Sequence, residues 1–165
     1  MEKELNVFSS IEEAKKNGAK WDLITSFHVV EHLPDPKKIL KEYWNFTEFR
    51  TPQEAIINSV LQQKDTIALL PTGGGKSICF QVPAMVKEGV CLVISPLIAL
   101  MQDQVENLKK RNIKATLIPS GASQDEIVSL FDNIKFGNYK FLYISPERLQ
   151  TIHIQQKIKE LNISF

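Results

Sequence analysis

The chain has 165 residues, enough for one ordinary domain with a hydrophobic core and too few for a motor with two lobes. Hydrophobic residues account for 43% and charged residues for 24%, the profile of a globular protein, and no apolar run reaches the about 18 residues of a membrane span. The formal net charge of +1 excludes a uniformly basic nucleic-acid binder, so any contact with DNA must come from a local patch.

Residues 1–41 contain a single candidate strand, Trp21–Val30, followed by two prolines that force an extended turn. A lone strand has no partner with which to form a core, so we expect this part to be poorly ordered. The segment His28–His32 spells H-x-x-E-H, a metalloprotease pattern that requires a helix. On a strand the two histidines would lie about 13 Å apart, so no zinc site is expected. The first residues lack the apolar core of a signal peptide, and we expect a cytoplasmic protein.

From Glu42 onward, short apolar strands alternate with helices. The expected strands are Thr66–Leu70, Val90–Ser95, Ala115–Pro119, Lys140–Ser145 and the first residues of a fifth at Ile163–Phe165. The expected helices start at Thr51 (as N-cap, with Pro52 first in the helix and Glu54 in a capping box), Lys76, Leu97, Ser123, Pro146 and Ile152. Continuous apolar strands that are each followed by a helix predict an α/β domain with a parallel sheet covered on both faces.

Two cysteines, Cys79 and Cys91, lie in apolar segments and form no CxxC pair. We therefore expect two buried thiols in a reducing compartment, and neither a disulfide nor a zinc site.

The most informative segment is Pro71-Thr72-Gly73-Gly74-Gly75-Lys76-Ser77, which falls between an expected strand and an expected helix. Its glycines allow backbone N–H groups to form an anion-binding concavity, and the helix adds its positive N-terminal end. Lys76 can then reach the β- and γ-phosphates of a nucleotide, and the Ser77 hydroxyl can bind Mg²⁺. One departure from the G-x-x-x-x-G-K-[ST] pattern is Leu70, which stands in the place of the first glycine.

The flanking residues resemble RecQ-family helicases of superfamily 2, which also relax that first glycine position. The resemblance rests on FTEFRTPQ (46–53), PTGGGKSICFQVPA (71–84), SPLIALMQDQ (95–104) and YISPERL (143–149), and it covers about residues 43–165. Asn45 departs from the aromatic-glycine pair that the family often carries there. The resemblance implies an ATP-dependent 3′-to-5′ DNA helicase that uses Mg²⁺, works in DNA repair and recombination, and has a RecA-like P-loop domain.

Two residues ahead of the loop are candidates for holding the adenine. The amide of Gln53 can accept from the adenine amino group and donate to N7, and Arg50 can stack on the base or bond near it. The alternative for both is an exposed helix N-terminus. Candidate contacts with single-stranded or forked DNA come from the strand ends and the helix that follows: Ser95, Pro96, Gln102, Ser145, Pro146 and Arg148. Simple helix capping is an alternative for the serines, and Gln102 can equally serve an interdomain contact. The basic residues at 109–114 are interpreted as a solvated helix end.

In the RecQ family the next strand carries an Asp-Glu-Ala-His segment, and here the sequence ends at Phe165 as that strand begins. We therefore expect residues 42–165 to form an ATP-binding domain that is incomplete at its C-terminus, binds Mg-nucleotide weakly, and neither hydrolyses it efficiently nor unwinds DNA. Residues 20–40 resemble an interior piece of class I S-adenosylmethionine-dependent methyltransferases. Two alternatives follow: a non-catalytic truncated or fused product with a nucleotide-binding fold, or a methyltransferase remnant that acts as a binding module.

Overall fold

The computed structural model describes residues 35–165, so the strand expected at Trp21–Val30, the H-x-x-E-H segment and most of the methyltransferase-like segment lie outside the described part. The helices are α2 (Pro36–Trp44), α3 (Gln53–Leu61), α4 (Lys76–Val86), α5 (Ile98–Lys109), α6 (Gln124–Phe136), α7 (Pro146–Leu149) and α8 (Ile152–Lys159). The strands are β1 (Cys91–Ile94), β2 (Ala115–Leu117) and β3 (Phe141–Ile144). None of the helices described is both long and apolar enough to cross a membrane.

The three strands form one parallel sheet with the order β1-β3-β2, so β3 is the central strand. Phe141 of β3 pairs with Cys91 on one side and with Ala115 on the other, which aligns the carboxyl ends of all three strands at one edge. All four residues of β3 are buried, as a central parallel strand requires. The expected α/β class with a parallel sheet is therefore confirmed.

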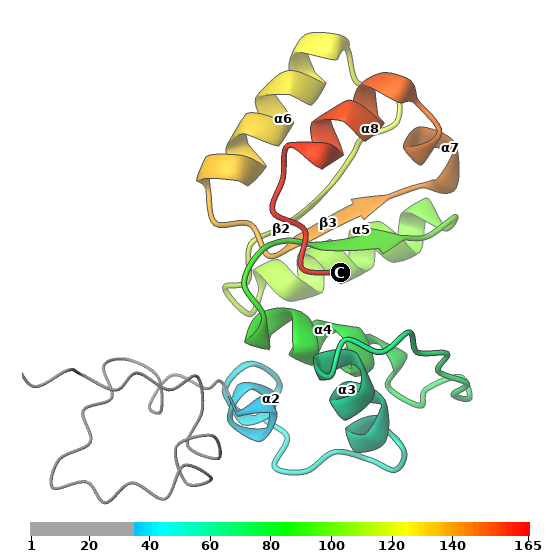
Figure 1. Ribbon diagram of the computed structural model, residues 1–165, viewed down its shortest axis with the longest axis vertical. Helices are drawn as coiled ribbons and strands as arrows, with labels where there is room; N and C mark the ends of the chain where they lie inside the picture. The colour runs from blue at the N-terminus through cyan, green and yellow to red at the C-terminus, as the bar shows by residue number, and fades with distance from the viewer. Residues whose placement is uncertain (1–34) are drawn as a thin grey trace, which may run out of the picture. The chain divides into compact units, whose positions relative to one another are not determined.

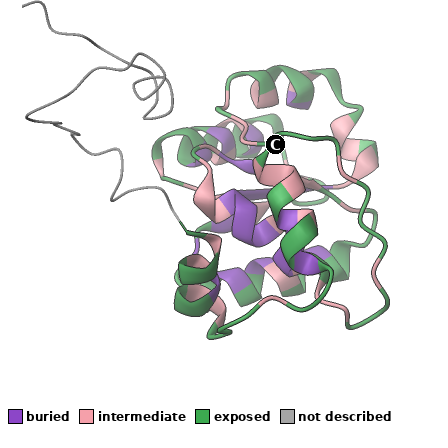
Figure 2. Ribbon diagram, turned by 60° about the horizontal axis from the view of Figure 1, so that its bottom comes forward, coloured by how far each residue is buried: buried purple, intermediate pink, exposed green. Residues whose placement is uncertain are grey.

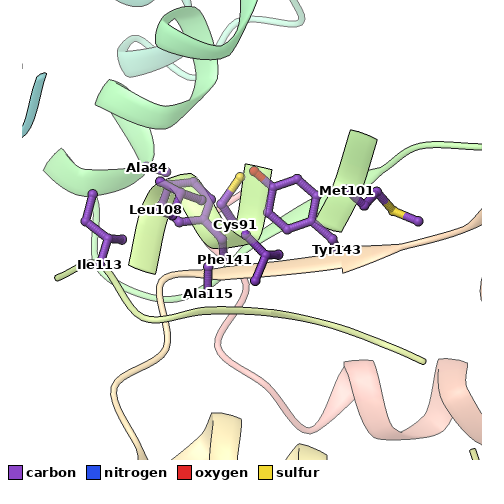
Figure 3. Packing of buried hydrophobic residues seen from close by; sticks show 9 residues of the cluster. Ala84, Cys91, Met101, Leu108, Ile113, Ala115, Phe141 and Tyr143 are labelled. Carbon is purple, nitrogen blue, oxygen red and sulfur yellow. The ribbon is translucent and has the colours of Figure 1, made fainter. Parts of the chain in front are cut away.

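Alternate residues of β3 enter two different hydrophobic clusters, one on each face of the sheet. Phe141 and Tyr143 pack with Met101 and Leu108 of α5, as the close-up of this cluster shows (Figure 3). Leu142 and Ile144 pack instead with residues of α6 and α8. Figure 1 shows the same division, with α6 and α8 on one side of the sheet and α4 and α5 on the other. The period of two along the strand thus produces helical layers on both faces.

A third cluster joins the helices that precede the sheet. Leu40 of α2, Ile57 of α3 and Val82 of α4 are at most 1% exposed and pack together. The buried faces of these helices are visible in purple in Figure 2, with exposed residues on their outer sides. The domain boundary expected between residues 41 and 42 falls inside α2, which runs from Pro36 to Trp44 and packs on α4.

The expected strand Thr66–Leu70 is wrong: these residues form no strand and pair with none in the described part of the chain. Ile67 is 91% exposed and Leu69 is 88% exposed. An apolar run becomes a strand only where a neighbouring strand completes its hydrogen bonds. The free edge of β1 pairs instead with the C-terminal residues, through a parallel bridge between Val90 and Ile163. Of the fifth strand expected at Ile163–Phe165, only this bridge forms.

Two helix starts also differ from expectation. Helix α3 begins at Gln53, and Pro52 occupies its N-cap position without a side-chain capping bond, so the capping box expected from Thr51 and Glu54 does not form. Helix α5 begins at Ile98 after Leu97, and Ser95 lies too far back to be its N-cap. Its hydroxyl accepts a hydrogen bond from the Leu97 N–H at 3.3 Å instead, which closes a local turn.

Candidate functional site

The phosphate-loop candidate, residues 71–77, turns sharply into α4. Gly73 and Gly75 have φ angles of 78° and 75°, in the left-handed region that favours glycine. The Gly74 N–H donates to the Pro71 carbonyl at 3.0 Å, which closes the turn. Gly75 is the N-cap of α4 and offers no side chain to the helix, so the first N–H groups of the helix receive no capping bond. The loop therefore delivers free donors and a positive helix end to one place.

Two side chains from the preceding segment hold the back of this loop. The Gln53 amide nitrogen donates to the carbonyls of Gly74 and Gly75, at 3.3 Å each, and its oxygen accepts from the Arg50 N–H at 2.9 Å. The Arg50 guanidinium donates to the Gly73 carbonyl at 3.5 Å. These bonds use the carbonyls of the loop. The N–H groups of the loop other than that of Gly74 are therefore left for a ligand.

The expected surroundings of Gln53 are therefore corrected. It is only 4% exposed, so the alternative of an exposed helix N-terminus is wrong for this residue. Its amide is engaged with the loop and with Arg50, so reading an adenine edge requires an exchange of partners. Arg50 itself is exposed. The geometry makes Gln53 the link between the segment before α3 and the phosphate loop.

Lys76 and Ser77 are the first two residues of α4. Lys76 is exposed, and its ammonium group donates to the Pro71 carbonyl at 3.2 Å, across the mouth of the loop. Thr72 is exposed beside it. The free N–H groups, the ammonium group and the helix end all favour an anion, so the residues present fit the phosphates of a nucleotide. The half-buried Ser77 hydroxyl is the oxygen available to a Mg²⁺ ion carried with them.

The candidate DNA contacts other than Gln102 meet at the carboxyl edge of the sheet. β1 and β3 are in register at Ile94 and Ile144, and the Ser95 N–H donates to the Ile144 carbonyl at 3.0 Å, so Ser95 and Ser145 leave neighbouring strands side by side. Ser145 caps α7 by accepting from the Arg148 N–H at 3.4 Å, which confirms the capping role for this serine. Pro96 is exposed and Pro146, the first residue of α7, is half-buried.

Arg148 lies at the same edge, where its guanidinium donates to the carbonyl of Pro119, just beyond β2, at 2.9 Å. One of its five N–H donors is thereby fixed, and the others remain for a phosphate. Gln102 lies on the exposed side of α5. Of the basic residues near the end of α5, Arg111 donates to the Asn107 carbonyl at 2.7 Å, which agrees with a role at the end of that helix. Lys114 instead donates to the carbonyl of Gly137, the C-cap residue of α6, at 2.7 Å.

Both cysteines are buried and free, as expected. Burial raises the pKa of the Cys79 thiol and raises the pKa of Cys91 to about 12, against a smaller opposing effect of Lys140. A thiol that stays protonated is a poor nucleophile and a poor metal ligand. Burial likewise lowers the pKa of Lys140, whose ammonium group donates to the carbonyls of Lys87 and Gly89. These groups belong to the packing of the sheet.

Sequence reasoning missed two residues close to the phosphate loop. Gln104 of α5 donates to the Ser77 hydroxyl at 3.4 Å, and the Tyr143 hydroxyl donates to the Gln104 carbonyl at 2.9 Å. These partners are 27 and 39 positions apart in the chain, so no local spacing pattern could have paired them. They come together because α4, α5 and β3 share one hydrophobic cluster.

A glycine-rich loop that leads with Lys76 and Ser77 into a helix, together with a parallel sheet that has helices on both faces, defines the chain as part of a RecA-like P-loop domain. The family model described as DEAD/DEAH box helicase matches residues 50–164. The chain belongs to this family, and its relatives among the RecQ helicases show that it corresponds to the nucleotide-binding front part of such a helicase.

Three of these relatives are similar over most of the chain. A probable ATP-dependent DNA helicase RecS from Bacillus subtilis is 44% identical over 78% of this chain and 26% of its own length. An ATP-dependent DNA helicase RecQ from Pasteurella multocida is 35% identical over 96% of the chain and 24% of its own length. The ATP-dependent helicase SGS1 from Saccharomyces cerevisiae is 45% identical over 67% of the chain and 8% of its own length. The chain thus spans about a quarter of the length of these two bacterial relatives.

Proposed function

We propose that this chain binds ATP with Mg²⁺ at residues 71–77 and contacts DNA at the carboxyl edge of the sheet, as the nucleotide-binding part of an ATP-dependent DNA helicase. The observation that carries the proposal is the set of free N–H groups at the start of α4, uncapped at Gly75 and flanked by Lys76. The relatives named as ATP-dependent DNA helicases support the choice of ATP as the nucleotide and of DNA as the polymer.

Each group in the site has a distinct part in that function. The backbone N–H groups of the loop and the Lys76 ammonium group bind the phosphates and offset their negative charge. A Mg²⁺ ion bound with the nucleotide would be held by the Ser77 hydroxyl and would neutralise charge on the terminal phosphates. Gln53 and Arg50 keep the loop carbonyls turned away from the anion through their bonds to Gly73 and Gly74. The base would bind by replacing one of these bonds.

The DNA part of the proposal rests on the grouping of Ser95, Ser145 and Arg148 at one edge. Hydroxyl groups, helix N-termini and guanidinium donors contact the sugar-phosphate backbone and carry no sequence information. We extend the proposal to single-stranded or forked DNA as the substrate, to 3′-to-5′ movement in the complete motor, to repair and recombination of DNA as its setting, and to the cytoplasm as its compartment.

The test is nucleotide binding by calorimetry with Mg·ATP on the 165-residue chain and on Lys76→Ala. Loss of a charge-assisted contact with phosphate should lower the affinity by about 2 kcal/mol, or about 30-fold. Lys135→Ala is the matched control, since it removes the same charge from the exposed surface of α6 and should leave the affinity unchanged. Equal affinity of the wild type and Lys76→Ala, with a folded variant, would contradict the proposal.

A further inference from the structure

The Ser77 hydroxyl is held from the side of α5. It accepts a hydrogen bond from the Gln104 amide nitrogen at 3.4 Å, and Gln104 in turn accepts from the Tyr143 hydroxyl at 2.9 Å. The three residues come from three separate elements, α4, α5 and β3. They form a continuous chain of polar contacts from the phosphate loop to the central strand.

Tyr143 is the fixed end of this chain. It is 1% exposed within the cluster that joins β3 to α5, and Figure 3 shows its hydroxyl directed away from the strand. Burial raises the pKa of Tyr143 to about 12, with a smaller opposing effect from contact with Gln81, so the phenol keeps its proton. A buried phenol that keeps its proton needs an acceptor, and the Gln104 carbonyl supplies it.

That bond decides which way the Gln104 amide faces. Because its carbonyl oxygen is directed to Tyr143, its NH₂ group is directed to Ser77. A serine hydroxyl has two acceptor lone pairs and one proton. When Gln104 takes one lone pair, the remaining lone pair has a restricted set of directions in which a cation can meet it. The amide thus selects the orientation of the oxygen expected to bind a metal ion.

A pocket beside Ser77 leaves room for its hydroxyl to change direction. Ser77, Gln81 and Gln104 line a pocket of about 270 Å³ together with Trp44 and Arg111. The long 3.4 Å separation between the Gln104 nitrogen and the Ser77 oxygen leaves this bond weaker than the one to Tyr143. The weaker bond therefore lets the Ser77 oxygen adjust its direction without losing Gln104, while the stronger bond keeps Gln104 attached to β3.

We propose that Gln104 is a positioning residue for the Ser77 hydroxyl and that Tyr143 positions Gln104, so that these two contacts form a relay that orients the Ser77 oxygen toward Mg²⁺. The proposal rests on the proposed function of residues 71–77. The two elements that carry the relay lead to known segments. Helix α5 follows the Ser95–Pro96 turn, and β3 continues directly into Ser145 at the start of α7. Ser77 is thereby joined to both segments that are proposed to contact DNA.

The test separates affinity for the nucleotide from the part of that affinity that Mg²⁺ supplies. Binding of ADP is measured by calorimetry on the full 165-residue chain with excess Mg²⁺ and again with EDTA. Gln104→Met, which keeps length and burial but neither donates nor accepts, should reduce the Mg²⁺-dependent gain in affinity by about 10-fold, as loss of a residue that orients a metal ligand does. The affinity for ADP in EDTA should not change, because Gln104 does not touch the loop carbonyls.

Tyr143→Phe should reduce the Mg²⁺-dependent gain in ADP affinity by less than Gln104→Met does, because the Gln104 amide can still reach Ser77 but is no longer oriented by the Tyr143 hydroxyl. The double variant should be no worse than Gln104→Met alone, since both act through one contact. Glu106→Ala, an exposed change on the same helix, is the control and should match the wild type.

Additive losses, or equal losses with Mg²⁺ and with EDTA, would mean that the two residues only support the fold and would overturn the relay. An unchanged Mg²⁺-dependent gain in Gln104→Met would overturn it as well. Failure of the wild type to bind ADP under either condition is a different result, since it removes the proposed function itself and with it the role of Ser77.

Discussion

Gly75 has two independent reasons to be glycine. Its φ of 75° lies in the left-handed region, and a Cβ added there would collide with the Gln53 amide nitrogen. The second reason matters for function, because Gln53 is the side chain that holds the carbonyls of Gly74 and Gly75. A larger residue at 75 would therefore disturb both the turn and its support.

Gly75→Ala should destabilise the protein and weaken nucleotide binding. The left-handed conformation alone costs a non-glycine residue about 1 kcal/mol, and displacement of Gln53 adds to it. Gly121→Ala is the matched control, with a φ of 77° and nothing within 4 Å of the added Cβ. Urea unfolding should show a larger loss for Gly75→Ala than for Gly121→Ala. Equal losses would show that Gln53 yields without cost.

The phosphate loop shows what residue types alone reveal. The order of glycines, lysine and serine at residues 73–77 predicts an anion site, because the chemistry is local to the motif. The partners of Gln53 could not be predicted in the same way. Its amide was expected to face a base, and in the structure it faces Gly74 and Gly75, 21 and 22 positions further along the chain.

Among the elements, the helices with local signals agree best with expectation. α4 runs from Lys76 to Val86, as predicted, with Pro83 inside it, and α6 starts behind Ser123 with a complete capping box that includes Glu126. The start of α3 was less predictable, since Pro52 takes the N-cap position and Gln53 bonds elsewhere. Helix capping can be predicted where the capping side chain and the helix are adjacent in sequence. The prediction is wrong where a tertiary contact competes for the same groups.

The sheet should make the protein sensitive to alkaline pH. Burial raises the pKa of Cys91 from 9.0 to about 12 and that of Tyr143 from 10.0 to about 12. A group whose pKa is higher in the folded than in the unfolded state stabilises the fold fully at pH values below its unfolded-state pKa. This stabilisation is lost as the pH rises through its folded-state pKa. The free energy of unfolding should therefore fall between about pH 9 and pH 12, by up to about 1.4 kcal/mol per pH unit for each group.

Lys140 acts with the opposite sign, because burial lowers its pKa below 10.5 and its contribution to stability grows as the pH rises toward that value.

Replacing Cys91 with valine removes one raised pKa and keeps a small apolar side chain. Urea unfolding of Cys91→Val, measured from pH 8 to pH 11, should show a shallower decline than the wild type. An identical decline would exclude Cys91 as a source of the alkaline loss.

At the scale of the molecule, the sequence indicates how many apolar segments there are but not which of them find partners. Thr66–Leu70 has the composition of a buried strand, yet Ile67 and Leu69 are almost fully exposed. The sheet has the order β1-β3-β2, and β1 is bridged on its other side by Ile163. Strand pairing is decided by residues far apart in the chain, so composition predicts the class of fold and leaves the neighbours of each strand undetermined.

The same long-range pairing creates the proposed DNA-binding edge. Ser95 and Ser145 follow β1 and β3, whose register places them side by side, and the Arg148–Pro119 bond ties the same edge to the end of β2. Arg148→Gln should weaken binding of a single-stranded oligonucleotide and should lower the slope of log affinity against log salt by about 1, since one phosphate contact is lost. Lys159→Gln, an exposed change at the end of α8, removes the same charge away from the edge and should alter the slope less. Fluorescence anisotropy over a salt series measures both. If the two variants have the same slope, the contribution of Arg148 is general charge attraction and the carboxyl edge is not where the backbone is held.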